Sequence, residues 1–313
     1  MQLQNQFQSL LNLLGESNQS KSSYWKRHTK YFQVNENRSV SGVYGIGGNC
    51  RRTLLRSLYN HIFQRLWTHF EQKRLSGHKI FSSPWHKLFT DVTRSQGRII
   101  DIDALRHIFT FDLIDRYVLE NIKVNNVCVI GDGMTNFVSP SLRSKLFKKV
   151  ISVNLVEVLL NDLFLLEREE SLKEHEVGIA ITKEELLRLL ADSETHLILV
   201  PAFKAPMLFN QGIELFVNIA SFQEMTNETI ANYFQIIKSN NSYFYCCNRE
   251  YKKLYGGEIL EFMQYPWGNP HVIIDEYCPW HQTYYDKKYP FFFQYDGAIM
   301  HRLVKYNDCQ TTN

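Results

Sequence analysis

The stretch Val127-Cys-Val-Ile-Gly-Asp-Gly-Met-Thr-Asn-Phe137 joins a run of apolar β-formers to a glycine-rich turn. This order predicts a strand, a tight turn and a helix, with free backbone amides at the carboxyl end of the strand. Ligands of open α/β sheets bind at such strand ends. We therefore predict that Gly131, Asp132 and Gly133 hold a cofactor, the alternative being an ordinary turn between a strand and a helix.

The next predicted strand, Lys149–Leu155, supports a cofactor site. Asn154 lies at its end, about 20 residues beyond the glycine turn, where a ribose-binding side chain belongs. Its amide offers both a hydrogen-bond donor and an acceptor. A dinucleotide-binding fingerprint that starts at Gly131 needs a further glycine at position 136, where this chain has Asn136. An NAD(P)-dependent sugar-modifying oxidoreductase is therefore the second enzyme hypothesis and not the first.

The remaining sequence predicts an α/β sheet. Short apolar runs alternate with helical stretches, which is typical of a parallel sheet covered on both faces. A last strand, Ala298–Tyr306, follows a turn at Asp296-Gly297, and we expect it to be an antiparallel edge strand. The other expected strands are residues 127–130, 149–155, 196–200, 215–219 and 243–247, and the expected helices are 111–122, 157–170, 183–191 and 227–238.

Four further blocks accompany the Ile130-Gly-Asp-Gly133 turn: Val153-Asn-Leu155 running into Glu157-Val-Leu-Leu160, Phe216-Val-Asn-Ile-Ala-Ser-Phe-Gln-Glu-Met225, Tyr245-Cys-Cys-Asn-Arg-Glu250 and Cys278-Pro-Trp-His281. Over residues 111–306 the chain resembles the sugar O-methyltransferase family. The resemblance implies a Rossmann-like class I methyltransferase sheet of seven strands, the last one antiparallel. It also implies S-adenosyl-L-methionine as cofactor, Ser221 among its binding residues, and methyl transfer to a hydroxyl of a sugar, nucleotide sugar or glycoside in glycan or glycoside biosynthesis.

Two positions differ from the wider methyltransferase pattern. Val129 stands where an acidic residue usually precedes the glycines, and Asn154 stands where an acidic residue usually binds the ribose. A catalytically inactive relative that binds a nucleotide or a glycan is therefore a third hypothesis.

Methyl transfer to a sugar hydroxyl is helped by a base that removes the hydroxyl proton. Glu224 and His281 are the candidate bases; their structural alternatives are a helix cap and a histidine that holds loop backbone. His281 is slightly preferred, because an ordinary pKa near 6.5 leaves it mostly neutral near pH 7. Asn248, Arg249 and Trp280 are candidate acceptor-binding residues, with a buried ion pair to Glu250 or Asp275 as an equal alternative for Arg249.

Positive charge is concentrated early in the chain. Residues 1–120 contain 17 Lys and Arg and 9 Asp and Glu, a net charge of +8, which leaves −5 for the remainder. We predict that residues 1–110 form a helical, basic cap that faces an anionic acceptor, the alternative being a solvated helical surface, and that residues 111–313 form the methyltransferase domain. The basic residues are dispersed through helical periods, so no nucleic-acid partner is expected. The apolar stripe Leu54, Leu58, Ile62, Leu66 and Phe70 predicts one helix of this region.

The composition of the 313 residues, with 44% hydrophobic and 21% charged, is that of an ordinary globular protein. No apolar run approaches the roughly 18 residues of a membrane-spanning helix. The first basic residue is Lys21, so we expect no secretory signal and a cytoplasmic protein. The six cysteines form no CxxC pair, and we expect no disulfide, structural zinc or other metal. Cys246 and Cys247 should face opposite sides of their strand.

Overall fold

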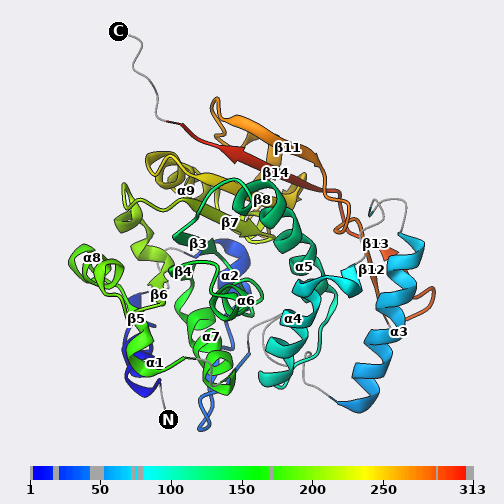
Figure 1. Cartoon of the computed structure of the whole chain (residues 1–313), viewed down its shortest axis with the longest axis horizontal. Helices are drawn as coiled ribbons and strands as arrows, with labels where there is room; N and C mark the ends of the chain where they lie inside the picture. Colours follow the sequence, from blue (N-terminus) through cyan, green and yellow to red (C-terminus); the bar gives the residue numbers. More distant parts are fainter. Residues whose placement is uncertain are drawn as a thin grey trace.

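The computed structural model describes residues 3–16, 21–42, 53–71, 75, 80–169, 172–286 and 288–307. Within these residues the centre of the molecule is an eight-stranded sheet with the strand order β11-β14-β8-β7-β3-β4-β6-β5 (Figure 1). Seven strands run in one direction, and β14 is antiparallel to both of its neighbours. The strands are β3 (Asn126–Ile130), β4 (Lys149–Asn154), β5 (Val177–Ile179), β6 (Leu197–Pro201), β7 (Leu215–Ile219), β8 (Tyr243–Arg249), β11 (His271–Tyr277) and β14 (Ile299–Lys305).

The predicted α/β fold with an antiparallel last strand is confirmed, although two details of the sheet differ. The sheet has eight strands because β5 extends it beyond β6, and three residues that include Gly178 are too few to give a periodic signal. β14 is an internal strand, because β11 pairs along its outer side and forms the edge. β11 is largely exposed, so it lacks the apolar run that marks the buried strands.

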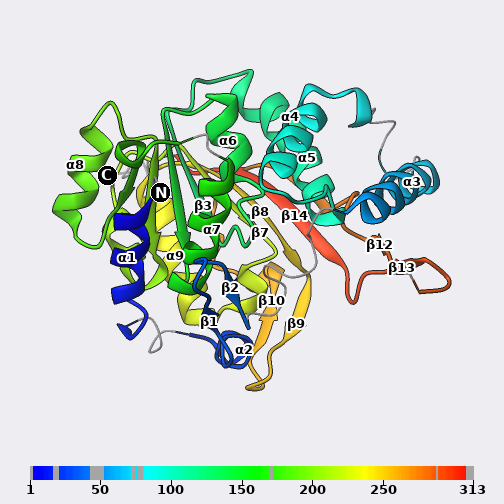
Figure 2. The same cartoon turned by 90° about the horizontal axis from the view of Figure 1, so that it is seen from below.

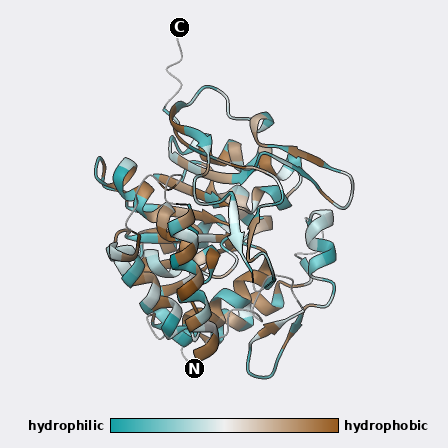
Figure 3. Cartoon of the chain, turned by 90° about the vertical axis from the view of Figure 1, so that its right-hand side faces the viewer, coloured by the Kyte–Doolittle hydropathy of each residue, from teal (hydrophilic) through white to brown (hydrophobic). Residues whose placement is uncertain are grey.

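Alternate strand residues pack into two separate cores. Val127 and Val129 lie in one core with α4 (Pro84–Ser95), α5 (Ile102–Ile114) and α7 (Val156–Glu169). The other core holds Cys128 and Ile130 with α8 (Lys183–Ala191) and α9 (Asn227–Ser239). Cys246 and Cys247 divide in the same way, as predicted. The strands and the helix faces turned toward them are accordingly largely hydrophobic (Figure 3).

The described parts of the first 110 residues pack in several separate places. α1 (Gln4–Asn12) packs against α7 and β5. α2 (Ser23–His28) lies beside β9 (Tyr251–Lys253) and β10 (Ile259–Glu261) (Figure 2), where Tyr24 stacks on Tyr255. α5 continues through the predicted boundary between residues 110 and 111. In the described part of this region, residues 21–25, Arg98 and α5 reach the carboxyl ends of the central strands.

α3 (Leu54–Phe70) lies at one side of the molecule (Figure 1). Trp67 on its inner face donates a hydrogen bond to Thr283 of β12 (Thr283–Tyr285), which pairs with β13 (Phe292–Gln294). The predicted stripe from Leu54 to Phe70 lies on the opposite, exposed face. The described residues also form the helix α6 (Val138–Ser144) and a short antiparallel pair of strands, β1 (Gln33–Val34) and β2 (Val40–Ser41). No helix of the described residues is long and apolar enough to cross a membrane.

A buried ion pair links residue 21 to α7, which covers one face of the sheet. The ammonium of Lys21 contacts the carboxylate of Glu157 in the first turn of α7, and both side chains are buried. Lys21→Met should lower the free energy of unfolding by about 3–5 kcal/mol, because it leaves a buried carboxylate without its cation. Lys87→Met is the control: Lys87 pairs with Asp91 on an exposed helix surface, and its loss should cost about 0.5 kcal/mol or less. Urea denaturation measures both; equal losses would contradict this role for Lys21.

Candidate functional site

A cavity of about 580 Å³ lies at the carboxyl ends of β3, β4, β6 and β7. Residues 21–25, α5, α9, His281 and Tyr295 also line it. The cavity is therefore where the sequence predicts a cofactor, at the strand ends of an open α/β sheet. Seven predicted site residues line it, namely Gly131, Asp132, Gly133, Asn154, Ser221, Glu224 and His281, whereas Asn248, Arg249 and Trp280 do not.

The two glycines of the turn after β3 have different reasons to be glycine. Gly131 has a φ of +78°, and a Cβ added there would lie 2.2 Å from the hydroxyl oxygen of Ser221. A Cβ added to Gly133 would meet no heavy atom within 4 Å. Gly131 is thus required by its backbone conformation and by its neighbour. Gly133 keeps open the part of the cavity that it lines.

Asp132 closes the start of α6. One oxygen of its buried carboxylate accepts the backbone N–H groups of Phe137 and Val138, at 2.8 and 2.7 Å. These amides begin the helix and would otherwise be free to bind an anion. The carboxylate of this chain therefore occupies the place that a phosphate group takes at other helix N-termini.

Asn154 brings a free hydrogen-bond donor to the cavity wall. Its Oδ1 accepts the backbone N–H of Leu155 at 3.0 Å. Its Nδ2 is buried and has no hydrogen-bond partner among the described residues. An unpaired buried donor costs free energy unless a ligand accepts from it. The end of β4 is therefore suited to bind an oxygen of a ligand.

A buried network of side-chain amides fixes the ends of β3, β7 and β8. Asn218 donates to the carbonyl of Ile130 at 3.0 Å and accepts from Asn248 at 2.8 Å. Ser221 also donates to the carbonyl of Ile130, and Asn248 accepts the backbone N–H of Gln223. Asn248 thus holds the ends of the strands in place and does not line the cavity. Sequence reasoning missed Asn218, although an asparagine within the apolar strand Leu215–Ile219 was a visible signal.

Glu224 lines the cavity on the loop that follows β7. Burial raises the pKa of its carboxyl group to about 7, against smaller opposing effects of a Tyr24 hydrogen bond and the charges of Lys252 and Arg249. α2 holds this loop, because the Ser22 hydroxyl donates to the backbone carbonyl of Glu224. A pKa of about 7 suits a group that accepts a proton near neutral pH.

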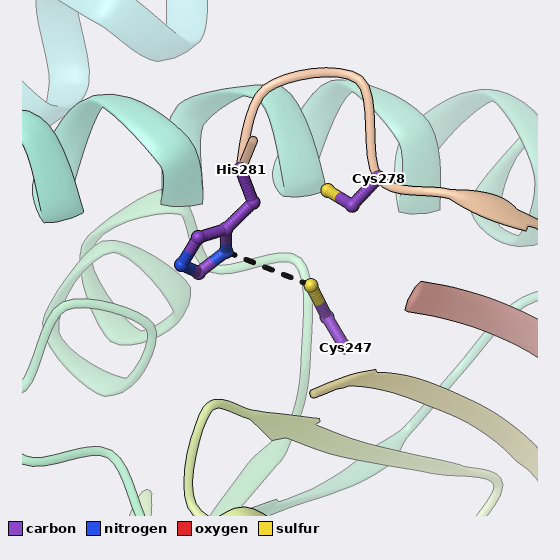
Figure 4. Close-up of side chains that lie close together, drawn as sticks. All are labelled: Cys247, Cys278 and His281. Atoms are coloured by element: carbon purple, nitrogen blue, oxygen red, sulfur yellow. Dashed lines mark hydrogen bonds between the residues drawn. The ribbon is translucent and has the colours of Figure 1, made fainter. Parts of the chain in front are cut away.

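His281 is buried and lines the same cavity. Burial lowers its pKa well below the ordinary value, and the positive charge of Arg106 lowers it further. Its Nδ1 lies 3.7 Å from Sγ of Cys247, with Cys278 beside them (Figure 4). Sequence reasoning missed this cluster because Cys247 is distant in the chain. The Cys278-x-x-His281 spacing was its one visible signal.

Arg249 and Trp280 lie behind the cavity wall. Arg249 pairs with the exposed Asp296 at 3.1 Å, and its guanidinium packs on the ring of Tyr295, which does line the cavity. Trp280 is stacked on Phe109, with ring centroids 5.4 Å apart. Arg249 thus forms an ion pair, but its partner is the exposed Asp296 and not Glu250 or Asp275, with which the structural alternative expected a buried pair; Asp275 pairs with Arg302 instead.

The predicted basic wall is not present in the described lining. Lys21 and Arg106 are its basic residues, and each is engaged, Lys21 by Glu157 and Arg106 by Asp103 at 2.8 Å. Arg106 also donates to the backbone carbonyl of Thr283. The excess positive charge of residues 1–120 is therefore not concentrated at the described part of the cavity. The glycine-rich stretch at residues 45–49 lies outside the described residues.

No protein-family model matches the chain, and no curated protein matches it significantly. Solved structures with a similar fold include a S-adenosylmethionine-dependent methyltransferase from Clostridium acetobutylicum (10% identity, 66% of this chain, 93% of that chain, TM-score 0.37). A second is M. capricolum TrmK in complex with S-adenosyl-homocysteine (9% identity, 64% of this chain, 68% of that chain, TM-score 0.37). A third is TehB from Haemophilus influenzae (13% identity, 63% of this chain, 62% of that chain, TM-score 0.39). TM-scores this low assign no function to the chain.

The two glycines provide a test of the turn. Gly131→Ala should lower the free energy of unfolding by about 1–3 kcal/mol, because alanine is strained at a positive φ and its Cβ meets Ser221. Gly133→Ala should change it by less than about 0.5 kcal/mol, since its Cβ meets open space. Urea denaturation of both variants decides, and equal destabilisation would contradict the different roles.

Proposed function

We propose that this chain is an S-adenosylmethionine-dependent O-methyltransferase whose acceptor is a sugar hydroxyl. The proposal rests on two features of one cavity. The N-terminal amides of a helix are already hydrogen-bonded to a carboxylate of the chain, and a buried side-chain N–H has no acceptor among the described residues. Asp132 caps α6, and Asn154 offers its Nδ2 at the neighbouring strand end. This combination suits a cofactor that has a ribose but no phosphate.

The cap on α6 argues against the oxidoreductase hypothesis. A dinucleotide places its pyrophosphate on the N-terminal amides of the first helix. Here Asp132 already accepts from those amides, and its carboxylate would repel a phosphate group. Asn136, at the position of the missing glycine, accepts a hydrogen bond from Arg98 at 2.9 Å and belongs to the support of the turn. S-adenosylmethionine has no phosphate and so meets neither obstacle.

The described residues fit S-adenosylmethionine in three parts. Asn154 would donate to a ribose hydroxyl, and the open side of Gly133 would admit the methionine portion close to the backbone. Leu155 and Phe203 supply apolar surface in the same cavity for the adenine. Ser221 serves indirectly, because its hydroxyl is bonded to Ile130 and holds the turn. When bound, S-adenosylmethionine supplies an electrophilic methyl group.

Between the two candidate bases, which both line the cavity, the direction of the pKa shifts favours Glu224. A carboxylate with a pKa of about 7 is present near neutral pH and is a far stronger base than an ordinary glutamate. His281 is neutral there but resists protonation, because it is buried next to Arg106. We therefore assign proton removal to Glu224, and the preference for His281 drawn from its ordinary pKa is given up.

The rest of the cavity wall supports a sugar as the acceptor. Tyr295 and Trp25 offer aromatic surface, while Asp103 and His107 offer polar groups. Sugars present both C–H faces and hydroxyl groups, which match such a mixed wall. Because the described basic lining residues are already paired, we favour an uncharged glycosyl group over the phosphates of a nucleotide sugar.

Cofactor binding can be tested at Gly133. Gly133→Val should weaken S-adenosylhomocysteine binding at least tenfold in isothermal titration, because the branched side chain fills space that the cofactor needs. Gly15→Val is the matched control: a Cβ at Gly15 also meets no atom within 4 Å, and Gly15 does not line the cavity. Circular dichroism checks that both variants are folded. Unchanged affinity in folded Gly133→Val would contradict the proposed cofactor position.

The role of Glu224 predicts a pH dependence. Glu224 must be deprotonated to accept a proton, so kcat should rise with pH up to about 7 and then level off. Glu224→Gln should lower kcat by about 10²–10⁴ with S-adenosylhomocysteine affinity retained. Release of S-adenosylhomocysteine with a panel of glycosides is the readout. Glu228→Gln, on the exposed start of α9, should behave like the wild type; a fully active Glu224→Gln would overturn the assignment.

A further inference from the structure

Three potential metal ligands meet beside the cavity. They are the thiol of Cys247 at the end of β8, and Cys278 and His281 in the loop that follows β11. Their ligand atoms lie within 4.8 Å of one another, with 3.7 Å between Sγ of Cys247 and Nδ1 of His281. All three residues are buried, and Figure 4 shows both sulfur atoms and one ring nitrogen turned toward a common point.

We propose that Cys247, Cys278 and His281 bind one zinc ion. Zinc bonds of about 2.3 Å to sulfur and about 2.0–2.1 Å to nitrogen place tetrahedral ligand atoms about 3.6–3.8 Å apart. The Cys247 to His281 separation already has this length, and the remaining separations need to contract by about 1 Å at most. Each thiol gives its proton to solvent as its sulfur binds the metal.

The loop that carries two of the ligands is held in place without a metal. The backbone N–H of Cys278 donates to the carbonyl of Ile299 at 2.8 Å, and that of His281 donates to the carbonyl of Cys278. Arg106 donates to the carbonyls of Trp280 and Thr283 on either side of His281. The ligands are thus preorganised by contacts that metal binding does not disturb.

The donor set selects the metal and leaves one position open. Two thiolates and an imidazole suit zinc and do not suit magnesium or calcium, which prefer oxygen. The group found among the described residues has three ligands, and zinc usually takes four. Because His281 also lines the cavity, we assign the fourth position to water or to an oxygen of a cavity ligand. A zinc ion bound there would link β8 to the loop that carries Cys278 and His281, beside the proposed acceptor position.

Metal content tests the proposal without cofactor, acceptor or activity. Tag-free protein is stripped with a chelator, incubated with zinc sulfate, dialysed and analysed by inductively coupled plasma mass spectrometry. We expect about one zinc per chain. Cobalt(II) in place of zinc should give the near-ultraviolet absorption of thiolate-to-metal charge transfer. Wild-type protein that binds no zinc, or a cobalt complex without thiolate absorption, would overturn the proposal.

Adjacent cysteines provide a matched pair of variants. Cys247→Ser and Cys278→Ser should lose the zinc, whereas Cys246→Ser should keep it, because Cys246 is equally buried on the opposite face of β8. Zinc retained by Cys247→Ser, or a Cys247–Cys278 disulfide found by non-reducing peptide mapping of the wild type, would refute the site. If the serine variants do not fold, the cobalt spectrum of the wild type decides. Failure of the methyltransferase proposal would leave all these readouts unchanged.

Discussion

At Gly131 the backbone passes so close to the hydroxyl of Ser221 that no side chain fits between them. The left-handed φ of Gly131 turns the chain out of β3, and the carbonyl just before it accepts hydrogen bonds from Ser221 and Asn218. These contacts add to the backbone pairing of β3 with β7 and fasten the end of β3 to the loop after β7. The cavity exists because these two strand ends are held together while their loops diverge around it.

The same turn determines the charge at the cavity floor. It delivers Asp132 to the first amides of α6, so the helix dipole and its free N–H groups are satisfied by the chain itself. On the other side, the fixed Ser221 begins the short segment that carries the half-buried Glu224 to the cavity wall. One turn thus supports two features of the same cavity, the Asp132 cap on α6 and the loop that carries Glu224, whose pKa burial raises to about 7.

How far the sequence predicted this molecule depended on how local each feature is. The strand at 127–130, its glycine turn and Asn154 were predictable, because apolar runs and glycines act on their own neighbours. β5 was too short, and β11 too exposed, to give a pattern. The apolar stripe from Leu54 to Phe70 correctly predicted a helix. Periodicity does not show which face of a helix packs against the protein, and here it is the face that carries Trp67.

The site residues that escaped prediction are those defined by distant partners. Asn248 reads as a substrate ligand until its bond to Asn218 is known, and Cys247 gains neighbours only when β14 and β11 complete the sheet. Titration of the wild-type chain with S-adenosylhomocysteine and, separately, with NADH tests the central claim most directly. The account predicts one S-adenosylhomocysteine bound per chain and no binding of NADH. Binding of NADH without binding of S-adenosylhomocysteine would contradict it.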